Sequence, residues 1–538
     1  MDPNERTIPR LVRRAAERFP SGAAIDDGGV TLSYPELLGA VRGASAALLA
    51  SGIAHGDRVA IWAPNVLEWV IAALAVHGVG GVLVPLNTRM KGGEAGYVLE
   101  KSGARLLFTV ASFLDNRYVT MLREALGGAL GGRPVAGLAS LERIVMLRGA
   151  AETGASAWAE FLAEGAAVPA GEVEARALGV AGDDLSDILF TSGTTGKPKG
   201  VMTTHAQNLR AFEAWSEVVG LREGDRYLIV NPFFHAFGYK AGILASIMRG
   251  ATILPQQVFD VALVLERIGR DRVSMLPGPP TLYQMILAAP DRARFDLSSL
   301  RLAVTGAASI PVELILRMRR ELTFETIITG YGLTEACGIA TMCRYDDDPE
   351  TIATTSGRAI PDVDVRCVDE RGAEVERGTP GEVVVRGYNV MRGYFEDPRA
   401  TADAIDAEGW LHTGDIGVMD ERGYLRITDR IKDMFIVGGF NVYPAEVESG
   451  LIGHDGIAQA AVIGVPDERL GEVGMAWVVA RPGCSPTAEA IIAWCRERMA
   501  NYKVPRYVEV VDALPMNASG KVTKFVLRDR ARERAPAS

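Results

Sequence analysis

The chain contains, at residues 187–200, the sequence DILFTSGTTGKPKG, in which an apolar segment leads directly into hydroxyl side chains, glycines and two lysines. The first part is typical of a buried strand, because short apolar runs bounded by turn residues form strands in α/β proteins. The second part suits a phosphate group, since glycines let backbone N–H groups face an anion, hydroxyls add donors and lysine adds charge. We therefore predict a strand followed by a phosphate-binding loop.

The Walker phosphate loop is the first alternative interpretation of residues 187–200. It requires a glycine five residues before Gly196 and a serine or threonine after Lys197, but the chain has Thr191 and Pro198 there. A flexible turn of small residues is the other alternative, but such a turn seldom combines four hydroxyls with two lysines. We therefore favour another kind of phosphate loop, made of Thr191, Ser192, Gly193, Thr194, Thr195, Gly196, Lys197 and Lys199.

The composition is that of a globular protein. Of the 538 residues, 48% are apolar and 23% are charged, whereas disordered chains have fewer apolar residues and more net charge. The length fits about three to four units of ~150 residues each. A net charge of −10 provides no basic field to hold nucleic acid, which we exclude as an expected partner.

Cysteines and apolar segments indicate a cytoplasmic protein. The five cysteines are dispersed and include no CxxC pair, which argues for a reducing compartment and against disulfides or structural zinc. Residues 1–20 lack the apolar core of a secretory signal. The most apolar run, Val70 to Pro85, is interrupted by His77 and glycines and is shorter than the ~20 residues of a membrane-spanning helix, so no integral membrane segment is expected.

Helix-like and strand-like segments alternate over residues 34–110 and 225–333, as in α/β proteins. After Thr355 short alternating segments predict a β-rich subdomain, and mixed α and β patterns return after residue 430. We therefore predict an α/β fold: a large N-terminal region, residues 1–430, of two α/β subdomains plus a β-rich subdomain, and a small mobile α+β C-terminal domain, residues 431–538. The strands we expect are 58–62, 82–85, 106–110, 227–230, 252–254, 273–276, 302–305, 326–329, 363–369, 381–386, 423–427, 460–465, 475–480 and 507–511.

Four further motifs follow the loop along the chain: GYGLTE at 330–335, WLHTGD at 410–415, TDRIKD at 428–433 and NASGK at 517–521. Each is weak alone, because Gly-Asp and Gly-Lys pairs are common in turns. All five together, in this order, resemble the motifs of the adenylate-forming superfamily, which includes acyl-CoA synthetases, luciferase-like enzymes and nonribosomal-peptide adenylation domains. The resemblance implies an acyl-CoA ligase that uses ATP, Mg²⁺ and CoA and passes through an acyl-adenylate.

Several motif residues also suit their implied roles on chemical grounds. Glu335 offers a hard oxygen ligand for Mg²⁺, with Thr191 as a further candidate ligand; a helix N-terminal acid is the alternative for Glu335. Tyr331 can stack on adenine, and Asp415 can accept hydrogen bonds from both ribose hydroxyls. Lys521 can bridge the carboxylate and the polyphosphate, two anions that repel each other during adenylation, although a surface lysine in a hairpin would have the same local sequence.

The resemblance implies further contacts to the nucleotide and to CoA. Adenine would lie against Gly306, Ala307 and Ala308, although packing explains the two alanines nearly as well. Arg430 would reach the ribose or a phosphate, and Thr334 the α-phosphate. Lys432 would be the hinge about which the C-terminal domain turns after adenylation. The other residues implied for nucleotide and CoA binding are Gly330, Gly332, Gly438, Gly439 and Phe440.

Two segments concern the acyl group. PFFHAFG at 232–238 resembles the family's gate to the acyl tunnel, with His235 in the gating position, and residues 276–281 resemble a wall of the acyl pocket. No acid stands out that would bind an amino group, which favours an apolar carboxylic acid. These segments resemble the CoA ligases of steroid-ring catabolism, which implies a methylhexahydroindanedione propionate (HIP) as substrate. Lys240 is expected either as a solvated charge or as a contact to a polar group of that substrate.

Other readings stay open. A medium- or long-chain fatty acid is the second substrate class, and an acyl-AMP ligase that loads a carrier protein is the rival activity. A non-catalytic nucleotide-binding regulator would be expected to lose Glu335 or Lys521, and both are present. A homodimer is open as well. Residues 515–521 fit a Pro-x-x-x-x-Gly-Lys pattern recognised by lysine acetyltransferases, which makes acetylation of Lys521 a hypothesis beside that of a plain turn.

Overall fold

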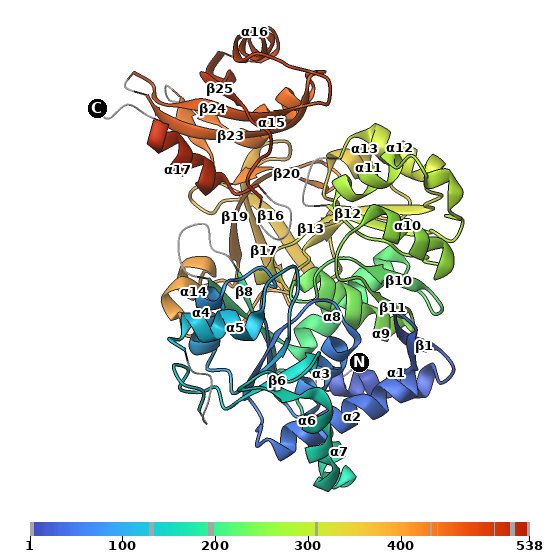
Figure 1. The fold of residues 1–538 in the computed structure, drawn as a ribbon. Helices are drawn as coiled ribbons and strands as arrows, with labels where there is room; N and C mark the ends of the chain where they lie inside the picture. Colours follow the sequence, from blue (N-terminus) through green and yellow to red (C-terminus); the bar gives the residue numbers. More distant parts are fainter. Residues whose placement is uncertain are drawn as a thin grey trace. The chain divides into compact units, whose positions relative to one another are not determined.

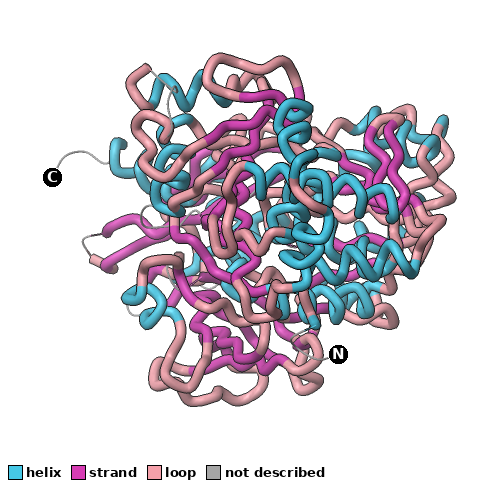
Figure 2. Tube along the Cα trace, turned by 90° about the horizontal axis from the view of Figure 1, so that it is seen from below, coloured by secondary structure: helices cyan, strands magenta, loops and turns pink. Residues whose placement is uncertain are grey.

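The computed structural model describes residues 5–128, 134–191, 198–306, 310–430, 433–437, 440–467, 469–499, 501–516 and 522–534. The chain forms two compact units, one of Met1–Asp364 and Val385–Leu411, the other of Val365–Val384 and His412–Ser538. Figure 2 shows helices and strands intermixed in the chain, as predicted for an α/β fold. The fold class expected from the sequence is confirmed.

An eight-stranded sheet with the order β18-β9-β8-β4-β3-β5-β6-β7 forms the centre of the larger unit. Strands β8, β4, β3, β5 and β6 are parallel, whereas β9 runs antiparallel to both β8 and β18. Every residue of β4 and β5 is buried, as expected of parallel strands covered on both faces. Three predicted strands are confirmed residue for residue. The strands are β3 (Arg58–Trp62), β4 (Val82–Pro85), β5 (Leu106–Val110), β6 (Arg143–Arg148), β7 (Ser156–Ala157), β8 (Leu185–Thr191), β9 (Lys199–Thr204) and β18 (Gly393–Tyr394).

The second sheet region of this unit consists of two four-stranded sheets, β10-β11-β1-β2 and β12-β13-β14-β15. Met275 bridges Tyr227 on one side and Leu302 on the other, and so connects them. The predicted strand 273–276 is wrong: Met275 alone forms bridges there, because the carbonyl of Arg226 accepts from both Ser274 and Met275, which breaks a regular ladder. The strands are β1 (Ala23–Asp27), β2 (Val30–Ser33), β10 (Arg226–Ile229), β11 (Thr252–Pro255), β12 (Leu302–Gly306), β13 (Thr326–Tyr331), β14 (Thr341–Met342) and β15 (Arg358–Ala359).

Helices cover these sheets. In Figure 1, α10, α11, α12 and α13 surround β12 and β13. Nearly all of α3 is buried, so the apolar run from Val70 to Pro85 is a buried helix followed by a strand, as predicted. The helices are α1 (Ile8–Arg18), α2 (Tyr34–Ala50), α3 (Leu67–Gly78), α4 (Gly92–Ser102), α5 (Tyr118–Ala125), α6 (Trp158–Glu164), α7 (Ala170–Leu178), α8 (His205–Val219), α9 (Ala245–Arg249), α10 (Val261–Arg270), α11 (Pro280–Ala288), α12 (Val312–Glu321), α13 (Pro349–Thr354) and α14 (Pro398–Ala404).

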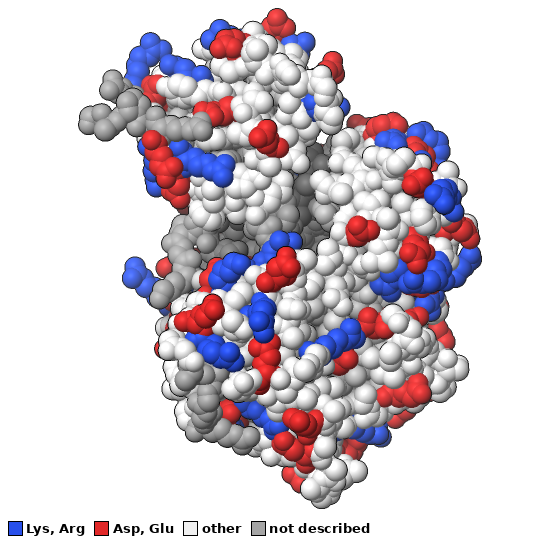
Figure 3. Space-filling model, in the orientation of Figure 1, with Lys and Arg blue, Asp and Glu red and all other residues white. Residues whose placement is uncertain are grey.

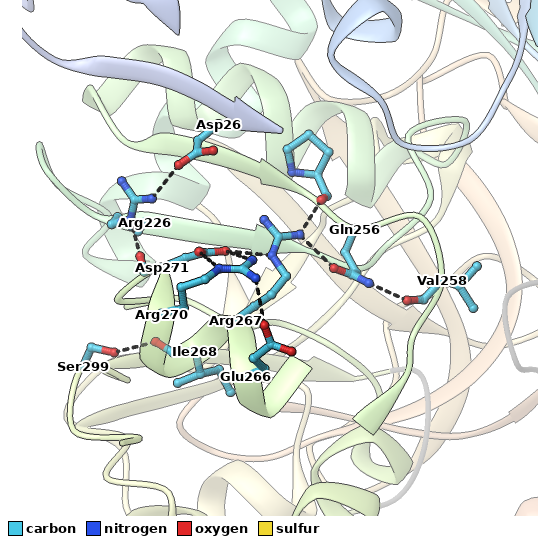
Figure 4. A network of polar contacts seen from close by, with 11 residues as sticks. Asp26, Arg226, Gln256, Val258, Glu266, Arg267, Ile268, Arg270, Asp271 and Ser299 are labelled. Carbon is cyan, nitrogen blue, oxygen red and sulfur yellow. Dashed lines mark hydrogen bonds and ion pairs between the residues drawn. The ribbon is translucent and has the colours of Figure 1, made fainter. Parts of the chain in front are cut away.

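Helix α10 is attached to β11 by a buried guanidinium, shown in Figure 4. Arg267 donates to the carbonyl of Pro255 at 2.6 Å, to Gln256 Oε1 at 2.8 Å and to Asp271 Oδ2 at 2.8 Å. Charge-assisted hydrogen bonds of this kind are stronger than neutral ones. They hold the helix against the carboxyl end of the strand.

The smaller unit holds most of a four-stranded sheet, β16-β17-β19-β20, and a five-stranded sheet, β22-β21-β24-β23 with β25 paired to β24. The predicted strand 423–427 begins later, at Leu425, because Gly423 has a left-handed φ of 79° in a turn. Its elements are β16 (Val363–Val368), β17 (Pro380–Gly387), β19 (Leu411–Met419), β20 (Leu425–Arg430), β21 (Phe435–Val437), β22 (Phe440–Val442), α15 (Pro444–Ile452), β23 (Ile457–Asp467), β24 (Gly471–Ala480), α16 (Ala488–Arg498), β25 (Tyr507–Val510) and α17 (Lys524–Arg534).

The surface charge, the length of apolar helices and the state of the cysteines also bear on the expectations from the sequence. On the face shown in Figure 3, lysine and arginine side chains are interspersed with acidic ones. Among the described residues, no helix is long and apolar enough to cross a membrane. All five cysteines are free thiols, and only Cys484 is exposed.

Candidate active site

Strands β8 and β9 hold the two ends of the predicted phosphate loop. They form an antiparallel hairpin whose last pair is Thr191 and Lys199. The Thr191 hydroxyl donates to the carbonyl of Lys199 at 3.5 Å. The loop residues between them, Ser192, Gly193, Thr194, Thr195, Gly196 and Lys197, lie outside the described residues.

The GYGLTE motif crosses from β13 into a three-residue 3₁₀ turn, η5 (Thr334–Ala336). Gly330 pairs with Gly306 of β12, and a Cβ atom on Gly330 would lie 2.9 Å from the carbonyl oxygen of Thr341. A Cβ on Gly332 would lie 2.2 Å from the carbonyl oxygen of Gly338. Only glycine fits at such distances, so the motif glycines allow the close backbone approach that sets the position of η5.

Tyr331, Thr334 and Glu335 are all half-buried at this end of β13. A turn of three residues sums few peptide dipoles. The alternative that Glu335 is merely an acid at a helix N-terminus therefore has little support. Ala307 and Ala308 lie outside the described residues.

Tyr394 connects Lys199 with Glu335, and sequence reasoning missed it. Its hydroxyl donates to Glu335 Oε1 at 3.0 Å, and Lys199 Nζ lies 4.9 Å from the centre of its ring. Burial, and then the negative charge of Glu335, raise the pKa of Tyr394, so its hydroxyl stays protonated. The only local signal is a Gly-Tyr pair in a two-residue strand, which no pattern distinguishes from an ordinary turn.

The segment expected to form the acyl gate leads into a π-helix, η3 (Phe237–Leu244), a form that is rare and frequent at functional sites. His235 is exposed just before it, and its Nδ1 accepts a hydrogen bond from the Phe237 amide at 3.2 Å. A neutral His235 therefore carries its proton on Nε2. Phe233 is buried against Trp69, with ring centres 5.2 Å apart.

Lys240 lies on the π-helix, and the expectation that it is a solvated charge is wrong. The side chain is fully buried, and its Nζ lies 3.1 Å from Asp187 Oδ1 and 3.0 Å from Thr203 Oγ1. Asp187 also accepts from Ser186 Oγ at 2.7 Å, Thr203 Oγ1 at 2.8 Å and Asn208 Nδ2 at 2.6 Å. A buried charge requires such partners, so Lys240 is a structural ion-pair residue that joins η3 to β8.

Two buried histidines adjoin this ion pair. His77 Nε2 lies 2.6 Å from the Tyr239 hydroxyl, and His205 Nδ1 accepts from the Ile8 amide at 3.3 Å. Burial, helped by the charge of Lys240, lowers the pKa of His77 to about 3, and burial with His77 as neighbour lowers that of His205 to about 3. Both rings are therefore neutral at physiological pH.

In the smaller unit, Asp415 of β19 pairs in antiparallel register with Arg430 of β20. Asp415 is buried, and its backbone amide donates to Thr413 Oγ1 at 3.1 Å. The preceding Gly414 has a left-handed φ of 70°, and its amide donates to Glu382 Oε1 at 3.1 Å. The fold thus brings together the two residues expected at the ribose.

The other residues expected in the smaller unit are not described in detail. Phe440 begins β22, without a described side chain. Lys432, Gly438, Gly439 and Lys521 lie outside the described residues.

The candidate metal ligands suit Mg²⁺, which proteins hold with few side chains, rather than a metal that is coordinated entirely by protein side chains. No group of three His, Cys, Asp or Glu side chains that could hold a metal occurs within the described ranges. Mg²⁺ is usually bound through one or two carboxylates together with substrate phosphates. Glu335 beside the ends of the phosphate loop meets that requirement.

Comparison with known proteins extends over the whole chain. A family model described as AMP-binding enzyme matches residues 12–395, and the AMP-binding enzyme C-terminal domain matches residues 446–521. The methyl-dioxo-octahydro-indenyl-propanoyl:CoA ligase of Rhodococcus jostii is 49% identical over 97% of this chain and 98% of its own. The ligase of the same name from Mycobacterium tuberculosis is 51% identical over 97% of this chain and 99% of its own.

Solved structures agree with these relatives. A fatty acyl CoA synthetase of Mycobacterium tuberculosis matches with a TM-score of 0.77 and 32% identity over 99% of both chains. The anthranilate CoA ligase AuaEII in complex with anthranoyl-AMP matches with a TM-score of 0.85 and 27% identity over 98% of this chain and 97% of that one. The resemblance predicted from the five motifs is confirmed. The chain belongs to the AMP-binding enzyme family and is an acyl-CoA synthetase.

Proposed function

We propose that the protein activates a steroid-derived bicyclic propionate, the methylhexahydroindanedione propionate HIP, as its CoA thioester. The observation that carries the proposal is the identity of 49% and 51%, over 97% of the chain, to two ligases whose names specify that propanoyl group. Adenylate-forming CoA ligases use ATP, Mg²⁺ and CoA. The carboxylate first displaces pyrophosphate from the α-phosphorus of ATP, and the CoA thiol then displaces AMP from the acyl-adenylate.

The residues of the larger unit supply the means to hold ATP. Lys199 and the loop after Thr191 would bind the polyphosphate, Thr334 the α-phosphate, and Tyr331 with Gly306, Ala307 and Ala308 the adenine. Glu335 would hold Mg²⁺, with Thr191 as a further ligand, and the metal would neutralise charge on the transferred phosphates. Hydroxyls, a lysine and a carboxylate at the ends of β8, β9 and β13 support this assignment.

The residues of the smaller unit would complete both half-reactions. Asp415 would accept from the ribose hydroxyls, with Arg430 beside it in register. Lys521 would offset the repulsion between the carboxylate and the polyphosphate during adenylation. We further propose a domain boundary at 430/431 with Lys432 as the hinge, after which Gly438, Gly439 and Phe440 would line the pantetheine tunnel.

The acyl side supports an apolar acid. His235 would be the gate residue in front of the π-helix, and the nearby Phe233 is buried against Trp69. Lys240 is engaged with Asp187 and so contributes no charge to the acyl site. A medium- or long-chain fatty acid is the second candidate substrate, favoured by the 32% identity to a fatty acyl CoA synthetase.

One experiment distinguishes these substrates. The protein is incubated with ATP, Mg²⁺ and CoA together with HIP, with octanoate, palmitate and ferulate, and with no acid, and the CoA products are identified by mass spectrometry. We expect kcat/KM for HIP to exceed that for every fatty acid by at least about tenfold, which is ~1.4 kcal/mol of transition-state binding. A higher kcat/KM for palmitate or octanoate would assign the enzyme to fatty acids instead.

Three subsidiary proposals concern the setting of the enzyme. Five free thiols support a cytoplasmic location. A homodimer is tested by light scattering of the purified protein. Acetylation of Lys521 by a lysine acetyltransferase would remove the charge needed for adenylation, and is tested by treating the protein with acetyl-CoA and an acetyltransferase while pyrophosphate release is followed.

A further inference from the structure

Tyr394 lies between a cation and an anion that the proposed function uses on the same ligand. Its ring faces Lys199 and its hydroxyl holds one oxygen of Glu335. Among the described residues, Lys199 and Glu335 form no ion pair with each other. The aromatic side chain therefore occupies the position in which the two opposite charges would otherwise neutralise each other.

The backbone around Tyr394 is held firmly. Its amide donates to Thr401 Oγ1 at 2.9 Å, and the next amide, of Phe395, donates to the carbonyl of Gly200 at 2.7 Å. Gly393 has a φ of 137°, and a Cβ atom there would lie 2.9 Å from Thr401 Oγ1. The side chain is thus presented from a position fixed to both β9 and α14.

The backbone of Glu335 is connected to the same segment. The amide of Met391 donates to the Glu335 carbonyl at 2.8 Å, so both the main chain and the side chain of Glu335 are bonded to residues 391–394. A hydrogen bond to one oxygen of a metal-binding carboxylate orients the other oxygen, and removing such outer partners typically weakens metal binding ~10- to 100-fold.

We propose that Tyr394 is a positioning residue that orients the Glu335 carboxylate toward Mg²⁺ and supports Lys199 for the polyphosphate of ATP. The inference rests on the proposed function of Glu335 and Lys199. It assigns two separable tasks to one side chain: the hydroxyl serves the metal and the ring serves the lysine. The two tasks can be removed one at a time.

The test uses Tyr394→Phe, which removes only the hydroxyl, and Tyr394→Leu, which removes the ring as well. Binding of a fluorescent, non-hydrolysable ATP analogue to the full-length protein is titrated at a series of Mg²⁺ concentrations from zero. For Tyr394→Phe we expect the Mg²⁺ concentration at half-saturation to rise about tenfold, with Mg²⁺-free binding unchanged. For Tyr394→Leu we expect, in addition, a two- to fivefold weaker Mg²⁺-free binding, the size of an exposed cation–π contact.

Tyr388→Phe is the matched control, because Tyr388 lies in the same segment but its ring faces Arg210 at 3.9 Å. Glu335→Gln is measured beside the other variants and is expected to lose the Mg²⁺ dependence, since an amide is a poor ligand for a hard cation. Thermal unfolding of each variant shows that it is folded.

The outcomes separate this inference from the proposed function. If Tyr394→Phe keeps the wild-type Mg²⁺ dependence while Glu335→Gln loses it, the positioning role is refuted and the metal assignment stands. If Glu335→Gln also keeps the wild-type dependence, the metal assignment and the inference fail together. Equal Mg²⁺-free binding of the Tyr394→Phe and Tyr394→Leu variants would refute the support of Lys199.

Discussion

Replacing Lys240 by methionine probes the buried ion pair between the π-helix η3 and β8. The substitution keeps the length of the side chain and removes the charge that lies 3.1 Å from Asp187 and 3.0 Å from Thr203. Removing one partner of a buried pair costs about 3–5 kcal/mol, because the remaining charge is left uncompensated. Asp187 keeps hydrogen bonds from Ser186, Thr203 and Asn208, so we expect a loss near the lower limit, about 3 kcal/mol.

Asp187→Asn should cost more, about 5 kcal/mol, because the Lys240 ammonium would retain one hydroxyl partner in an apolar surrounding. In the double variant neither charge is left alone. The loss of unfolding free energy in the double variant should therefore be about 2 kcal/mol smaller than the sum of the two single losses.

The assay is equilibrium denaturation in urea, with the free energy of unfolding of the four proteins compared at pH 7.5. Lys101→Met is the control, because Lys101 forms an exposed pair with Glu396 at 3.3 Å and should cost about 0–1 kcal/mol. A loss of under 1 kcal/mol for Lys240→Met, accompanied by a raised KM for the carboxylic acid alone, would refute the reasoning. Lys240 would then be a substrate contact.

Three further predictions address the site and its surroundings. Lys521→Ala should stop adenylation but leave thioester formation from supplied acyl-adenylate largely intact, because only the first step brings two anions together. The two half-reactions are measured separately, and an equal loss of rate in both would contradict this prediction. Gly332→Ala should lower the adenylation rate at least about tenfold, because its Cβ would lie 2.2 Å from the Gly338 carbonyl and η5 must shift; Gly39→Ala, with no atom within 4 Å, is the control, and equal rates would show that η5 tolerates the displacement. Since the pKa of His205 falls from 6.5 to about 3 on folding, the unfolded chain binds the extra proton, and stability falls as the pH drops below about 6.5. At pH 4.5 this one group costs about 2–3 kcal/mol relative to pH 7.5, so His205→Gln should show a smaller loss over that interval in urea denaturation, and an unchanged loss would contradict the assignment.

Local sequence patterns were sufficient to predict the central strands and to identify the family. The strands at 58–62, 82–85 and 106–110 were predicted residue for residue, because parallel strands buried on both faces are short, largely apolar runs. The five motifs identified the family because each is contiguous and their order is specific. The same contiguity predicts Glu335 just after a strand, and Glu335 lies in η5 after the end of β13, whereas Asp415 lies in the middle of β19.

Tertiary structure decided what depends on distant partners. The segment 273–276 has the pattern of a strand, but only Met275 forms bridges there, one to Tyr227 and one to Leu302. Lys240 looks like a surface charge in the sequence, and only the packing of the π-helix against β8 shows that it is buried with Asp187. Tyr394 contacts Lys199 and Glu335 because β18 pairs with β9, a strand almost two hundred residues earlier in the chain. Side-chain burial and the choice of hydrogen-bond partner depend on contacts between distant segments, and no local periodicity records them.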